Sequence, residues 1–107
     1  DLVIDCRFLP NPHWVPELRP RTGLEQDVRA YVLEQPLTAS FLEHTLPLFE
    51  FLIPSYIDEG KAYLTIAFGC TGGRHRSVVI AEEFGRILGE SGHRLRTRHR
   101  DLEAKEN

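Results

Sequence analysis

The sequence has 107 residues, which is enough for one compact domain and too few for two. Its composition is that of a water-soluble globular domain, and no apolar run approaches the ~20 residues of a membrane span. We therefore expect a cytoplasmic protein that does not contact membranes. The net charge of -3 produces no field that would attract nucleic acid. Of the 13 basic residues 11 are Arg, whose donor fork matches phosphate, although a GC-rich genome would produce the same bias.

The amino-terminal residues predict a short buried strand, because Leu2-Val3-Ile4 is an uninterrupted apolar run. The chain begins almost inside this strand, so we expect further sequence upstream of it. Residues 8–23 then hold four prolines, which exclude a helix or a central strand. We expect a long loop here, and loops of that length in compact domains are more often functional than filler.

Two helices are expected next. The first covers Leu24–Gln35, with its apolar residues on one face, and Pro36 stops it. The second begins at Ser40, which forms a capping-box pattern with Glu43, and runs to Gly60. Its two internal prolines each delete a backbone donor, so we expect a kink or a break at Pro47 and Pro54.

The rest of the chain predicts a strand, a helix and a strand. Ala62–Phe68 is nearly all apolar and typical of a strand covered on both faces, and a helix follows from about His75 to Glu90. His93–His99 alternates Arg with other residues, the pattern of a half-exposed strand, and the polar tail Leu102–Asn107 is expected to fray. The order β-α-α-β-α-β predicts an α/β fold, with a small, mostly parallel sheet and helical crossovers, for a single domain over residues 1–107.

In such sheets ligands bind beyond the carboxyl ends of the strands. Three polar segments leave those ends: Asp5–His13, Cys70–Ser77 and His99–Asp101. If the strands are parallel neighbours, the segments converge on one rim. Besides the loop described next, this rim would collect Asp5, Arg7, Asn11, His13, His99, Arg100 and Asp101.

The loop Gly69–Ser77 has the clearest chemistry. Gly72 and Gly73 allow a tight turn that exposes successive backbone N–H groups, and the following helix adds the positive end of its dipole. Arg74 and Arg76 add charge and paired donors, while Thr71 and Ser77 add hydroxyls. The segment therefore predicts a binding site for a phosphate-like anion. The alternative is a simple Gly-rich turn, for which two Arg and a His would be unnecessary.

Two other chemistries fit the residues less well. Cys70, Arg76 and Ser77 match Cys-(x)5-Arg-Ser, the phosphate cradle of cysteine-dependent phosphatases, but Gly69 replaces the His that usually precedes the Cys. Asp5 and Asp101 are the candidate general acids. A metal site is not expected, because no His or Cys pair has zinc-motif spacing and the neighbouring Arg disfavour a cation. No cofactor is expected either.

Several stretches, taken in order, resemble one family over essentially the whole chain: Phe8-Leu9-Pro10-Asn11-Pro12-His13-Trp14, Leu18-Arg19-Pro20, Thr22-Gly23-Leu24, Tyr63-Leu64-Thr65-Ile66-Ala67, Gly69–Ser77 and Arg98-His99-Arg100-Asp101-Leu102. They are similar to the carboxy-terminal domain of the RapZ/YvcJ proteins, the RNase adapter family. The resemblance implies a regulatory, non-enzymatic domain that binds glucosamine-6-phosphate or a related sugar nucleotide. Carried over by motif, the ligand-binding residues are His13, Thr71, Gly72, Gly73, Arg74, His75, Arg76 and Ser77.

The resemblance further implies an upstream P-loop nucleotide-binding domain, and a small regulatory RNA and an RNase as partners. This sequence has no Walker A motif, and its tail carries Glu103 and Glu106 where a basic tail contributes to RNA binding in the family. Arg94, Arg96 and Arg98 are the candidate RNA contacts, and a merely solvated face is the equal alternative. The sequence leaves the exact ligand and the oligomeric state open, a homo-oligomer included.

Overall fold

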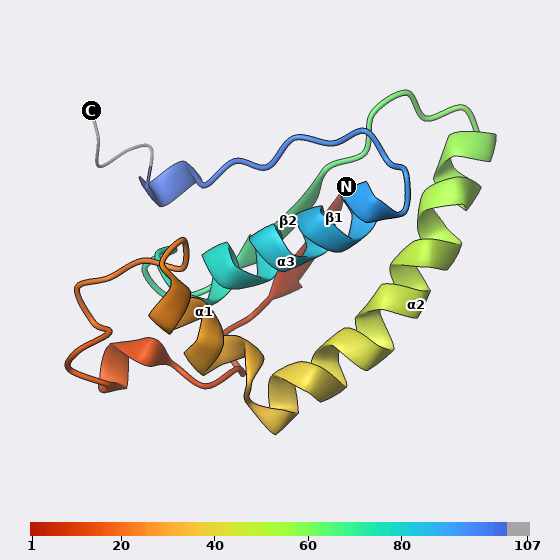
Figure 1. The fold of residues 1–107 in the computed structure, drawn as a ribbon. Coiled ribbons are helices and arrows are strands. Elements are labelled where there is room, and N and C mark those ends of the chain that lie inside the picture. The colour runs from red at the N-terminus through yellow and green to blue at the C-terminus, as the bar shows by residue number, and fades with distance from the viewer. Residues whose placement is uncertain (103–107) are drawn as a thin grey trace.

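The computed structural model describes residues 1–102 and shows an α/β domain, as predicted (Figure 1). The strands β1 (Leu2–Asp5) and β2 (Ile66–Gly69) form a two-stranded parallel sheet in which Leu2 pairs with Ile66 and Asp5 with Gly69. Residues 103–107, which include most of the tail expected to fray, lie outside the described part. The elements are β1 (Leu2–Asp5), the short 3-10 helix η1 (Pro12–Trp14), α1 (Gln26–Leu33), α2 (Pro36–Asp58), β2 (Ile66–Gly69) and α3 (Arg76–Glu90).

The core lies on one face of this sheet. Ile4 and Phe68 point toward a cluster that includes Phe49 of α2 and Phe84 of α3, whereas Val3 on the opposite face is 79% exposed. Burial alternates along both strands. The expectation that the second strand is covered on both faces is therefore wrong, because both helices of the main core pack on the same side.

The long helix differs from its prediction in where it starts and in its continuity. α2 begins at Pro36, and Ser40 lies inside it, so the expected capping box is wrong. Proline fits the first helical position because its fixed φ suits the helix and its missing N–H has no partner there. Pro47 and Pro54 lie within the helix, which curves without a break (Figure 1). Burial of Phe49 and Ile53 on its inner side offsets the lost donors. None of the described helices is long and apolar enough to cross a membrane.

The segment 93–99 is extended but is not a strand, so the predicted third strand is wrong. It runs along α3 instead of joining the sheet. The Thr97 hydroxyl and a Leu95 methyl lie 2.8 and 3.7 Å from the position that a Cβ on Gly85 would take. The period-2 pattern has a different cause, since one side of an extended chain packs against a helix while Arg94, Arg96 and Arg98 are exposed.

Candidate anion-binding site

Two of the three polar segments leave the sheet side by side. Because β1 and β2 are parallel and end in register, the chain after Asp5 and the chain after Gly69 emerge at the same edge. The Cys6 N–H donates to the Gly69 carbonyl over 2.7 Å, which continues the pairing one residue beyond the strands. The first half of the predicted convergence therefore follows directly from the parallel register.

The Gly-rich loop takes the turn that its glycines allow. Gly72 and Gly73 have φ values of +82° and +65°, in the left-handed region that favours glycine. Thr71 and Gly72 are exposed at the tip of the loop. The Ser77 N–H donates to Cys70 Sγ over 3.3 Å, and the Cys70 thiol donates to the Ser77 hydroxyl over 3.2 Å. The thiol thus closes the loop against the first turn of α3.

Arg76 is turned into the protein and holds the two strand-end segments together. Its side chain is almost fully buried, and Nη1 donates to the carbonyl oxygens of Arg7 (2.6 Å) and Leu9 (3.1 Å). The Nε atom is buried without a partner among the described residues. A residue predicted as a phosphate ligand therefore contributes to the architecture of the site.

His75 is also buried and joins the loop to the proline-rich segment. Its Nε2 lies 3.2 Å from the carbonyl of Arg19 and 2.8 Å from that of Arg21, so this nitrogen carries the proton because carbonyls only accept. The Gly23 N–H donates to the Arg74 carbonyl over 2.8 Å. The proline-rich segment is therefore fixed against the start of α3.

The rim residues near β1 make hydrogen bonds to residues close to them in the sequence. Asp5 accepts from Arg7 over 2.7 Å, and this hydrogen bonding lowers the pKa of Asp5 to about 2. The Asn11 side chain accepts from the His13 N–H over 3.1 Å and caps η1. The His13 ring is exposed, and its carbonyl accepts from Arg19 Nε over 2.7 Å.

A groove of about 640 Å³ lies between β2, the start of α3 and the carboxy-terminal segment. Its polar wall consists of residues from two parts of the chain. The Gly-rich loop and α3 contribute Gly69, Cys70, Gly73 and Ser77, and the carboxy-terminal segment contributes Arg96, Arg98, His99, Arg100 and Asp101. Residues of β2, Ala67 and Phe68 among them, supply an apolar wall. The groove thus brings the third predicted segment to the second, and Asp101 is its one acidic lining residue within residues 1–102.

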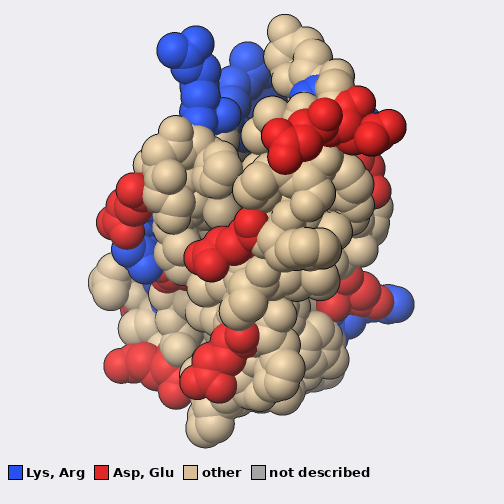
Figure 2. All heavy atoms as spheres, turned by 90° about the vertical axis from the view of Figure 1, so that its right-hand side faces the viewer, with Lys and Arg blue, Asp and Glu red and all other residues tan. Residues whose placement is uncertain are grey.

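Charge is segregated over the surface although the net charge is small. α2 carries Glu43, Glu50 and Asp58 and no Lys or Arg. Figure 2 looks onto the α2 side, where acidic side chains are scattered and the basic ones lie at the margins of the view, most prominently at the top. With three Arg lining it, the groove has the chemistry of an anion site, and residues 1–102 contain no cluster of three or more His, Cys, Asp or Glu side chains suited to a metal ion.

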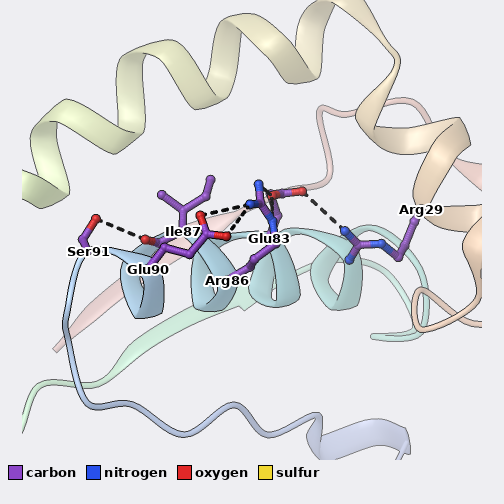
Figure 3. Close-up of polar contacts among 6 residues, drawn as sticks. All are labelled: Arg29, Glu83, Arg86, Ile87, Glu90 and Ser91. Atoms are coloured by element: carbon purple, nitrogen blue, oxygen red, sulfur yellow. Dashed lines mark hydrogen bonds and ion pairs between the residues drawn. The ribbon is translucent and has the colours of Figure 1, made fainter.

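Sequence reasoning missed a polar cluster behind the site (Figure 3). Glu83 of α3 is buried and accepts from Arg86 on the same helix and from Arg29 of α1, the latter over 3.5 Å. This cluster fixes α1 to α3. The available signal was Glu83 itself, a charged residue on the apolar face of a helix, which requires a partner when buried.

The two thiols are expected to differ in reactivity. Cys6 is fully buried and burial raises its pKa to about 12, so it carries no thiolate at pH 8, whereas Cys70 is partly exposed. A chromogenic disulfide reagent at pH 8 should therefore titrate one thiol per native chain and both in urea. Cys70→Ser should leave the native chain without a reactive thiol. Two reactive thiols in the native protein would contradict the buried position of Cys6.

Fold and site together define a small α/β domain with a basic groove that runs along its second strand to the Gly-rich loop. The chain belongs to the RapZ C-terminal domain family, whose model matches residues 1–103. It is 62% identical over 95% of its length to a nucleotide-binding protein of Desulforudis audaxviator, and 57% identical over 96% to one of Geobacter sulfurreducens. It spans only 35% and 36% of those two proteins.

Proposed function

We propose that this domain is a regulatory sensor that binds a phosphorylated amino sugar, glucosamine-6-phosphate or a related sugar nucleotide, in the groove. The observation that carries the proposal is the composition of that groove. The Gly-rich loop and the start of α3 contribute Gly73 and Ser77 to its polar wall, and the carboxy-terminal segment contributes Arg96, Arg98 and Arg100. Membership of the RapZ C-terminal domain family supports the regulatory part of the proposal.

The polar wall of the groove suits the phosphate of such a ligand, and the apolar wall suits its sugar ring. A phosphate next to Gly73 and Ser77 would meet the positive dipole end of α3. An Arg fork from the carboxy-terminal segment would add charge-assisted hydrogen bonds. The sugar ring would then lie along β2, whose apolar atoms pack well against the nonpolar faces of a ring.

We assign no catalysis to the domain. Cys70 Sγ is engaged with Ser77 in closing the loop, and the Arg76 guanidinium donates to the carbonyls of Arg7 and Leu9. The two side chains of the phosphatase-like motif are thus used to build the loop. The nucleotide binding named in the relatives is proposed to reside in the part of those proteins that this chain does not cover, because no Walker A motif is present here.

A second candidate function is contact with a small regulatory RNA, in an assembly with an RNase. The observation favouring it is that Arg94, Arg96 and Arg98 are all exposed along one extended segment. Such contacts go to phosphates, so this function requires an affinity for RNA that falls steeply with salt. Self-association of the domain would be compatible with either function.

The metabolite site is tested by a matched pair of arginines. Arg96 lines the groove, whereas Arg94, two residues away and also exposed, does not. Calorimetric titration with glucosamine-6-phosphate should show affinity about tenfold weaker in Arg96→Ala, from the loss of a charge-assisted hydrogen bond, and nearly unchanged in Arg94→Ala. Unphosphorylated glucosamine should not bind. Equal losses in the two variants, or no binding by the unmodified protein, would contradict the proposal.

A further inference from the structure

The carboxylate of Asp101 occupies an unusual place against the Gly-rich loop. An atom at the Cβ position of Gly73 would lie 1.9 Å from Asp101 Oδ2 and 2.8 Å from its Cγ, so the carboxyl group fills the space that a side chain at position 73 would need. Gly73 is therefore required twice, for its positive φ and for this contact.

This contact places a negative charge inside a groove whose other charged walls are positive. Asp101 accepts from Arg100 Nε over 3.2 Å, and its side chain is 38% exposed. No hydrogen bond joins its carboxylate to the Gly-rich loop among the described residues. The carboxylate is thus held by packing and by the surrounding positive charge, and it can leave without breaking a hydrogen bond to the loop.

We infer that Asp101 is a built-in competitor for the anion: its carboxylate fills part of the site and a phosphate group displaces it. The inference rests on the proposed function. A phosphate and a carboxylate cannot share this space, and two like charges a few ångström apart repel each other. Ligand binding would then move Asp101 away from Gly73.

The remaining contacts of the carboxy-terminal segment allow such a movement. The segment has no ladder pairing to β2, and the contacts that hold it besides Asp101 include Thr97 packed on Gly85, His99 Nε2 at 2.9 Å from Glu82, and the buried Leu102. Loss of the Asp101 contact would therefore loosen the end of a segment that carries four exposed Arg side chains: Arg94, Arg96, Arg98 and Arg100. Anion binding and the docking of this segment become coupled.

The competition is tested with inorganic phosphate as the probe. Asp101→Asn should bind phosphate about fivefold more tightly than the unmodified protein, because a neutral amide competes less and no longer repels the anion. The matched control is Asp58→Asn, which removes the same charge from the exposed end of α2 and should leave the affinity nearly unchanged. Equal or weaker binding by Asp101→Asn would overturn the inference. No phosphate binding by any of the three proteins would overturn the proposed function itself.

Displacement of Asp101 is tested separately in the unmodified protein. This test does not depend on whether Asp101→Asn folds correctly. Heteronuclear NOE values of the backbone amides of residues 98–102 report motion on the picosecond-to-nanosecond timescale. They should fall when phosphate is added. Unchanged or higher values in the presence of bound phosphate would show that Asp101 stays in place, and would overturn the inference even if the phosphate affinity of Asp101→Asn were higher.

Discussion

Replacing Arg76 by alanine should destabilise the domain by about 3–5 kcal/mol, since each hydrogen bond from a charged donor contributes about 1.5–3 kcal/mol. The buried guanidinium donates to two carbonyls in the chain that follows β1, and the substitution would leave both acceptors unpaired and a cavity at the start of α3. The free energy of unfolding, measured in urea, checks this expectation.

Two further variants test whether the loss of stability comes from the donors of the buried Arg76 guanidinium. Arg76→Lys keeps the charge but not the fork of donors, so its loss of stability should be smaller than that of alanine and still measurable. Arg74→Ala, at a less buried Arg of the same loop, should change stability by less than about 0.5 kcal/mol. If Arg76→Ala were as stable as Arg74→Ala and lost only anion affinity, Arg76 would be a ligand and not a structural residue.

A second large effect is expected in the aromatic core. The Phe84 ring lies 4.9 Å from Phe68, 5.1 Å from Phe49 and 6.1 Å from Phe41, measured between ring centroids. It therefore joins α3 both to β2 and to α2. Phe84→Ala should cost about 3–5 kcal/mol, as transfer of the ring and the cavity left behind both oppose folding.

The matched control for Phe84 is Phe51→Ala on the outer side of α2, where the ring is 69% exposed. This variant should lower the free energy of unfolding by less than about 1 kcal/mol, since little apolar surface leaves the core. Comparable losses in the two variants would mean that α2 buries its outer side as well. Because Phe84 aligns α3 with β2, we also expect Phe84→Ala to weaken anion binding.

The main elements were predictable because their apolar residues have a clear spacing. β1, α1 and α3 lie within a few residues of the predicted ranges, and the α/β class followed from their order. The sequence could not show that residues 93–99 form an extended segment outside the sheet rather than a third strand. Alternation of Arg with other residues over 93–99 indicates an extended chain that is covered on one side. The covering element can be a helix, as here, or a sheet, and the pattern is the same in both cases. The start of α2 was not predictable, because a proline can end one helix or begin the next, and Pro36 begins one.

The candidate site likewise has features that the sequence predicts and features that it does not. A tight turn at Gly72 and Gly73 was predictable from glycine itself. The carboxy-terminal segment does meet the loop, but the third strand that was expected to bring it there is absent from residues 1–102. The orientation of Arg76 and His75 could not be predicted. A cation beside a Gly-rich turn has the same appearance in a sequence whether it faces a ligand or a buried carbonyl. Only the path of residues 7–21 supplies those carbonyls.

The close approach of Gly23 to α3 has a consequence for recognition. A Cβ at this position would lie 2.7 Å from the His75 carbonyl and 2.8 Å from Val79 N, so the proline-rich segment lies directly on the helix backbone. Together with the buried Arg76 and His75, this contact gives one side of the groove a shape fixed before any ligand arrives. The conformational entropy of ordering that side is lost during folding and not on association, which favours tight binding of a small, rigid molecule.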